Sequence, residues 1–314
     1  MIPDRVRQRD LVGYGRTPPS FSWPNGAKVV VNLVLVYEEG SEASVLWGDD
    51  RNEGWGEYAD AGVQPPRRDP GTEAHYEYGS RAGVWRLARI FDDAAVPVTV
   101  SAAAVALELS PAVPDWMNER GHDLLGHGWR WIPLWDMPRD EEREHLRRAI
   151  ASYEQTLGQR PIGWNCPSWP SESTRELLVE EGGFLYDSDG CADDIPYYAS
   201  CLGKPFLVVP YSKTYNDSRF LMNPGFASPR DFLDTLVMGL DELVREGRTA
   251  MMTVAVHARW SGQAARAAAV RAFLEHAQRT PGVSFMRRGD IARWWLEQYP
   301  PPLSPSPSKS PEPG

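Results

Sequence analysis

Three short clusters of acidic, histidine and arginine residues could together hydrolyse an amide. Each follows an apolar run: the acid pair Glu38 and Glu39, then His127 with Arg130 and Trp131, then His257 with Arg259. Amide hydrolysis needs a base that activates water, a donor for the developing oxyanion and an acid for the leaving nitrogen. Carboxylates and imidazoles supply such acids and bases, so the clusters are candidates for hydrolytic chemistry if the fold brings them together.

We assign separate roles to the clusters. Glu38 or Glu39 is expected to be the base, because two adjacent, partly buried carboxylates raise the pKa of one of them. His257 is expected to protonate the leaving nitrogen, and Arg259 to orient the substrate. The competing interpretations are a solvated carboxylate in the acid pair and a hydrogen-bonded core histidine at position 257.

The elements that must position these residues alternate along the chain. Strands are predicted over 28–36, 96–101, 123–126, 184–186, 206–209, 250–256 and 283–286, and helices over 81–94, 139–157, 229–246, 264–278 and 290–298. Such alternation predicts parallel strands with helices outside them. Chemistry in these folds lies at the C-terminal ends of the strands, which is where all three clusters fall.

Two stretches do not fit this alternation. Residues 48–80 are polar and rich in Gly and Pro, and we interpret them as one long loop. Residues 300–314 are almost entirely Pro, Ser and charged residues, which predicts a disordered tail. We therefore expect a single catalytic domain over residues 1–299.

Composition restricts the partners and the compartment. The formal net charge is -10, and there is no basic run of the kind that nucleic acid or an anionic membrane would need, so neither partner is expected. The three cysteines cannot all pair, and the first residues lack the apolar core of a signal peptide. These features predict a cytoplasmic protein.

The clusters resemble the motifs of the polysaccharide deacetylases, whose NodB-homology fold is a distorted (β/α) barrel of parallel strands. Glu38 and Glu39 stand where that family has two aspartates. His127 matches the first histidine of the family's His-x-x-x-His metal pair, but Trp131 occupies the second position. His257 matches the late-strand histidine that protonates the leaving nitrogen. The segments 164–167 and 187–189 resemble the third and fourth motifs of the family.

A narrower resemblance extends from Asp10 to about Pro300. The strings RDLVGYG, YEEGSE, EYGSRAGVWRL, GHGWRWI, NDSRF and RRGDIARWW are similar to the allantoinase-like and cyclic-imidase-like branch. This resemblance implies ring-opening hydrolysis, assembly into a homo-oligomer and activity without a metal. Where allantoinases have Gly-Trp-Tyr-Thr-Gly-Arg, this chain has Asn165 after Gly-Trp and lacks the arginine, so Arg130 or Arg259 is expected to anchor the substrate.

A metal site remains an alternative interpretation. Glu39 and His127 are the candidate ligands, whereas a catalytic zinc normally has three protein ligands. A third could come from Asp123, Asp187 or Asp189. Without a metal, His127 could instead act in catalysis by hydrogen-bonding the attacking water or the carbonyl. We expect no required cofactor, with a weakly bound divalent metal such as zinc as the alternative.

The remaining candidates concern the substrate. Tyr37 could donate to the oxyanion, and Asn165 could contact the substrate. Several tryptophans near the motifs suggest an aromatic slot for a flat ring: Trp129, Trp131, Trp164, Trp169 and Trp260. A small-molecule cyclic amide, imide or ureide is the expected substrate. The alternatives are a metal-dependent N-deacetylase of a carbohydrate or small N-acyl compound, and a binding protein without catalytic activity.

Overall fold

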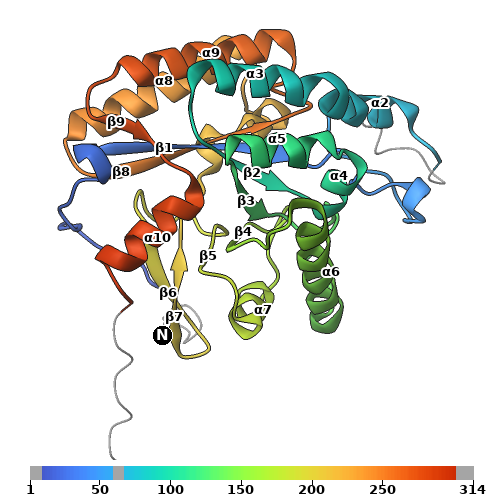
Figure 1. The fold of residues 1–314 in the computed structure, drawn as a ribbon, viewed down its shortest axis with the longest axis horizontal. Helices are drawn as coiled ribbons and strands as arrows, with labels where there is room; N and C mark the ends of the chain where they lie inside the picture. Colours follow the sequence, from blue (N-terminus) through green and yellow to red (C-terminus); the bar gives the residue numbers. More distant parts are fainter. Residues whose placement is uncertain (1–8, 59–66, 302–314) are drawn as a thin grey trace, which may run out of the picture.

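The computed structural model describes residues 9–58 and 67–301. In this part of the chain, nine strands form one sheet in the order β6-β7-β5-β4-β3-β2-β1-β8, with β9 paired to β1. The strands are β1 (Val29–Tyr37), β2 (Val98–Ala102), β3 (Asp123–Gly126), β4 (Gly163–Trp164), β5 (Tyr186–Asp187), β6 (Tyr197–Cys201), β7 (Lys204–Val208), β8 (Ala250–His257) and β9 (Val283–Phe285). All pairs are parallel except the antiparallel β6 and β7. The sheet curls into a half-barrel, which confirms the predicted distorted (β/α) barrel (Figure 1).

Helices cover the outside of the half-barrel. They are α2 (Pro70–Tyr78), α3 (Val84–Ala94), α4 (Ala104–Leu109), α5 (Ala112–Arg120), α6 (Arg139–Leu157), α7 (Thr174–Glu181), α8 (Pro229–Glu246), α9 (Ala264–Arg279) and α10 (Arg288–Gln298). Helices α3, α8 and α9 lie together over β1 and β8, and α6 packs against α4 and α5 (Figure 1). The central strands β1, β2 and β8 are therefore buried along their whole length, as expected for a parallel sheet covered on both faces.

Strand β1 is the centre of the sheet. Each of its nine residues is buried, and it pairs with β2, β8 and β9. Its β-branched sequence suits a pleated surface packed on both sides. The first residue beyond this strand is Glu38, so the acid pair begins at a rigidly held position.

Helix α8 begins and ends where its sequence predicts. The Ser228 side chain accepts from the backbone N–H of Asp231, whose own side chain accepts in return from the backbone of Ser228. Pro229 occupies the first turn, and Gly247 ends the helix with a φ of 68°, a left-handed conformation that glycine adopts without strain. The prediction of this helix is confirmed.

The predicted loop over 48–80 is wrong for its last part. Residues 70–78 form α2, and a π-helical turn over Gly79–Gly83 joins it to α3. Asp69 accepts from two backbone N–H groups of the first turn, and Pro70 follows it, which is a helix-start signal. The polar composition of the segment concealed this signal, because α2 buries only a few side chains, among them Thr72, His75 and Tyr76.

The sequence interpretation also missed α4, α5, α7, β4 and β6. Helix α4 is short and its first four residues are all buried, so it lacks the alternation of exposed and buried faces that reveals a longer helix. Strand β6 is mostly half-buried and pairs only with β7, an edge position that needs no apolar run.

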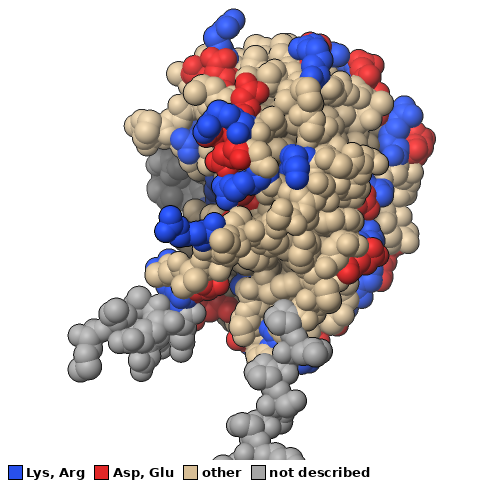
Figure 2. Space-filling view, turned by 90° about the vertical axis from the view of Figure 1, so that its left-hand side faces the viewer, with Lys and Arg blue, Asp and Glu red and all other residues tan. Residues whose placement is uncertain are grey.

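Three further features are the C-terminal tail, the distribution of surface charge and the apolar character of the helices. The predicted tail over 300–314 lies outside the described residues except for Pro300 and Pro301. On the face in Figure 2, acidic and basic side chains are intermingled on a largely uncharged surface. Among the described residues, no helix combines the length and the apolar character needed to cross a membrane.

Candidate functional site

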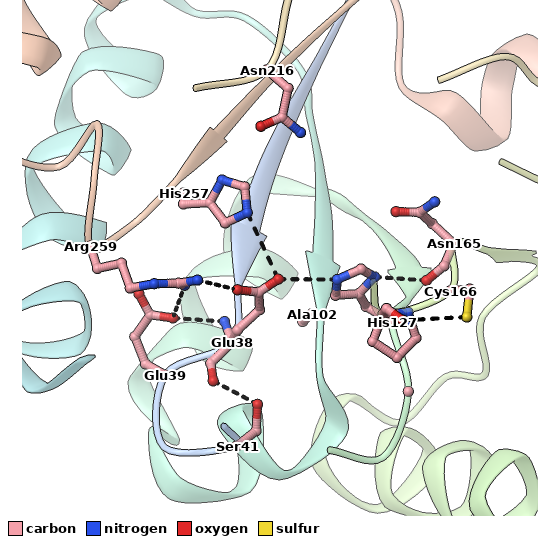
Figure 3. A network of polar contacts seen from close by, with 12 residues as sticks. Glu38, Glu39, Ser41, Ala102, His127, Asn165, Cys166, Asn216, His257 and Arg259 are labelled. Atoms are coloured by element: carbon pink, nitrogen blue, oxygen red, sulfur yellow. Dashed lines mark hydrogen bonds and ion pairs between the residues drawn. The ribbon is translucent and has the colours of Figure 1, made fainter. Parts of the chain in front are cut away.

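The three clusters meet at the C-terminal ends of β1, β3 and β8. The carboxylate of Glu38 lies between two imidazole rings, with its Oε1 atom 3.1 Å from Nε2 of His127 and 3.8 Å from Nε2 of His257. Figure 3 shows the two rings pointing at this oxygen from different elements. All three side chains line one cavity and are at least 94% buried. The structure thus brings together three of the residues that the sequence singled out.

His127 is held so that one nitrogen faces Glu38. Its Nδ1 atom lies 2.7 Å from the backbone oxygen of Asn165, which can only accept, so Nδ1 carries a proton. Its Nε2 atom then faces Glu38 Oε1, and two acceptors at 3.1 Å would repel each other. A proton must therefore lie between His127 and Glu38. If Glu38 is ionised, His127 is an imidazolium ion that places positive charge in the cavity.

His257 has a buried carboxylate behind it. Its Nδ1 atom lies 2.6 Å from Oδ1 of Asp217, whose Oδ2 accepts from the His257 backbone and from Ser261 Oγ. This pairing directs His257 Nε2 into the cavity and stabilises a positive charge on the ring. The sequence interpretation missed Asp217 as a functional residue. Its only signal was its position in the string NDSRF, 40 residues before His257.

Arg259 lies behind the acid pair. Its Nη2 atom is 2.6 Å from Oε2 of Glu38, and its Nη1 atom is 3.7 Å from Oε2 of Glu39. Burial by itself would raise the pKa of Glu38, but Arg259, together with His257 and His127, outweighs it and holds that pKa well below its usual range. Glu38 is therefore the ionised member of the pair.

Glu39 turns away from the two histidines. Its Oε2 atom accepts from the backbone N–H of Glu38, and its Oε1 atom packs so closely against Gly79 that a Cβ there would be 2.0 Å away. Burial, reinforced by the charge on Glu38, raises the pKa of Glu39 to about 8 against the lowering effect of Arg259. The predicted raised pKa thus falls on the carboxyl group that does not line the cavity.

The structure places three predicted substrate contacts outside this cavity. Tyr37 is fully buried and bonds to Ser80. The guanidinium of Arg130 is held by Asp49 and by the backbone oxygen of Glu42. Arg259 is 1% exposed and occupied by the acid pair. The sequence alone could not show that both arginines were already paired inside the protein.

Trp131 and Asn165, the other two predicted substrate contacts, do line the cavity. Its volume is about 170 Å³, and residues not predicted as contacts complete its wall, among them Trp55, Tyr211, Lys213, Asn216 and Ser218. Trp169 also contributes, as the aromatic-slot interpretation expected. Trp164 and Trp260 are instead buried and do not line the cavity, and the Trp260 ring packs against His257 with the ring centroids 4.1 Å apart.

The candidate metal ligands do not form a metal site. Glu39 faces Gly79 and Arg259, whereas the Nε2 atom of His127 faces Glu38. Asp123 accepts from the backbone of Gly289, and Asp187 is paired with Arg175. Within residues 9–58 and 67–301, no three His, Cys, Asp or Glu side chains are arranged to hold a metal ion. These residues do not fit the zinc site that a metal-dependent deacetylase would need.

Comparisons with known proteins identify the family of this chain. The family model of polysaccharide deacetylases matches residues 71–181. A Schizosaccharomyces pombe protein whose name assigns it to the polysaccharide deacetylases is 32% identical over 93% of this chain and 98% of its own length. The crystal structure of a probable polysaccharide deacetylase from Pseudomonas aeruginosa PAO1 superposes with a TM-score of 0.87, at 42% identity, over 93% of this chain and 99% of that one. The structure of PuuE allantoinase superposes with a TM-score of 0.88, at 41% identity, over 93% of this chain and 98% of that one. The chain therefore belongs to the polysaccharide deacetylase family, on its allantoinase-like branch.

Proposed function

We propose that this protein, a hydrolase of carbon–nitrogen bonds, opens a small cyclic amide, imide or ureide by attack of water on a ring carbonyl. The observation that carries the proposal is the convergence of Glu38, His127 and His257 on one small cavity. The similarity to PuuE allantoinase supports ring opening as the type of reaction.

Glu38 acts as the base in this proposal. It is the member of the acid pair that lines the cavity, and Arg259 keeps it ionised. It takes a proton from water as the water oxygen bonds to the carbonyl carbon, which gives a tetrahedral oxyanion. The imidazolium of His127 beside it stabilises this negative charge.

His257 acts as the acid. Its Nε2 atom stands 3.8 Å from Glu38 Oε1, beyond hydrogen-bond distance, so both groups can face the same substrate from the cavity wall. Asp217 stabilises the protonated ring. When the carbon–nitrogen bond breaks, the proton passes from His257 to the ring nitrogen. The products are a carboxylate and the freed nitrogen group, still joined by the rest of the former ring.

The size and lining of the cavity favour a compact ring over a polymer. A volume of about 170 Å³ is below the range of about 300–1,000 Å³ typical of sites for drug-sized ligands. The aromatic side chains of Trp55, Trp131 and Trp169 provide flat apolar contacts. The family membership keeps N-deacetylation as the second candidate function.

A substrate screen tests the function directly. We expect release of a carboxylate from at least one of hydantoin, allantoin, a dihydropyrimidine and succinimide, and no release of acetate from N-acetylglucosamine oligomers. Release of carboxylate is followed by titration or mass spectrometry. Deacetylation of the oligomers without opening of any ring would reject the proposal in favour of the second candidate.

We also expect activity without a tightly bound metal, because the candidate ligands face different directions. Elemental analysis of the purified protein should find less than one zinc per chain, and a chelator should leave most ring-opening activity intact. Stoichiometric zinc, with activity lost on chelation and restored by zinc, would contradict this expectation.

A further inference from the structure

We infer that Asn165 and Asn216 recognise the –CO–NH–CO– edge of a ring, so that cyclic imides and hydantoin-type ureides are preferred over simple lactams. This inference rests on the proposed ring-opening function and narrows it to one class of ring. It depends on the fixed orientation of two carboxamide side chains in the same cavity.

Asn165 presents an acceptor. Its Nδ2 atom donates to the backbone oxygen of Ser188 at 3.2 Å and to Oδ1 of Asp189 at 3.1 Å. A backbone oxygen can only accept, so the carboxamide cannot be reversed without losing this bond. Its Oδ1 atom is left facing the cavity, and no described residue donates to it (Figure 3).

Asn216 presents a donor. It is 4% exposed, its Oδ1 atom accepts from the backbone N–H of Ser218 at 2.7 Å, and its Nδ2 atom lies 3.0 Å from the hydroxyl of Tyr211. An N–H group can only donate, so this carboxamide is fixed in the opposite sense. One of the two Nδ2 protons has no acceptor within the described part of the chain.

The two groups match the edge of an imide. Figure 3 places His257 between Asn216 and Glu38, and His127 between Asn165 and Glu38. With one carbonyl beside Glu38, the ring N–H can donate to Asn165 and the second carbonyl can accept from Asn216. The N–H lies in the ring plane, whereas the lone pair that His257 protonates develops out of that plane, so the two contacts do not compete.

Other rings leave one of these groups unpaired. A lactam has no second carbonyl for Asn216, and an N-methyl imide has no N–H for Asn165. A buried polar group without a partner costs binding, and more so where the site was built to pair it. Each loss should lower kcat/KM relative to the imide by ~10–100-fold.

The test uses three five-membered rings: succinimide, N-methylsuccinimide and 2-pyrrolidinone. Asn165→Ala should largely abolish the preference for succinimide over N-methylsuccinimide and retain the preference over 2-pyrrolidinone. Asn216→Asp keeps the side-chain oxygen that accepts from the backbone N–H of Ser218. This variant should largely lose the preference for succinimide over 2-pyrrolidinone and retain the preference over N-methylsuccinimide. Differences in intrinsic reactivity cancel when each variant is compared with wild type on the same ring.

Controls separate recognition from general damage. Asn165→Ala keeps the backbone oxygen that orients His127, and Asn165→Ser is the substitute if the alanine variant fails to fold. Asn118→Ala removes a carboxamide on α5, outside the cavity, so both preferences should be unchanged. Variants that lower kcat/KM equally on all three rings would overturn the inference and leave the ring-opening function standing.

If wild type opens none of these three rings, binding decides the inference, and the wider substrate screen still decides the proposed function. The three rings are then titrated against the fluorescence of the cavity tryptophans Trp55, Trp131 and Trp169. The inference would be supported if, in Kd, each of the two variants lost the preference assigned to its own residue and kept the other preference. Equal binding of the three rings to wild type and variants would overturn it.

Discussion

Replacing His257 with Ala should lower kcat by ~10²–10⁴-fold, the usual contribution of a positioned general acid. KM should change far less, because His257 delivers its proton in the transition state. Asp217 holds the ring at 2.6 Å and stabilises its charged form, so the geometry favours the acid role over that of a core histidine. Steady-state kinetics on the ring identified by the screen measures both constants.

Thermal melts must show that the His257→Ala variant folds, because Asp217 loses a partner in it. His276→Ala is a matched control, since His276 pairs with Asp241 on the surface and should leave kcat unchanged. A folded His257→Ala variant with near-normal kcat would make His257 a structural residue, and His127 would become the next candidate for the acid.

Glu38→Gln should also reduce kcat by ~10²–10⁴-fold, because the amide keeps the shape of the side chain but cannot take a proton. Glu39→Gln is the matched control. With a pKa of about 8, Glu39 is largely protonated at neutral pH, and a neutral glutamine resembles it. Activity retained in the second variant and lost in the first would assign the base to Glu38, whereas the opposite pattern would assign it to Glu39.

The pH dependence gives a second readout for Glu38. Glu38 must be deprotonated to act as a base, and its pKa is held below the usual range. Wild-type kcat should therefore fall on the acid side only well below pH 4.5. Arg259→Gln removes the main charge that opposes the effect of burial. The pKa of Glu38 should then rise and the acid limb of the pH–rate profile should move to higher pH. An unchanged limb in a folded variant would contradict this coupling.

The sequence by itself determined the strands that carry the site and the residues at their ends. Strand β1 follows from the apolar, β-branched run 29–36. Helix α8 follows from the start signals at Ser228 and Pro229 and the stop signal at Gly247, which all lie next to the helix in the sequence. The carboxyl ends of parallel strands meet at one edge of the sheet, which places Glu38, His127 and His257 together.

Tertiary structure decided what each polar group contacts. Asp217 lies 40 residues from His257, and Arg259 is separated from Glu38 by more than 200 residues, yet both pairs are in direct contact. A sequence shows that an arginine is present but not that a buried carboxylate already occupies it. The different pKa values of Glu38 and Glu39 arise in the same way. Burial affects both carboxyl groups, but Arg259, His257 and His127 all lie against Glu38, which therefore remains charged.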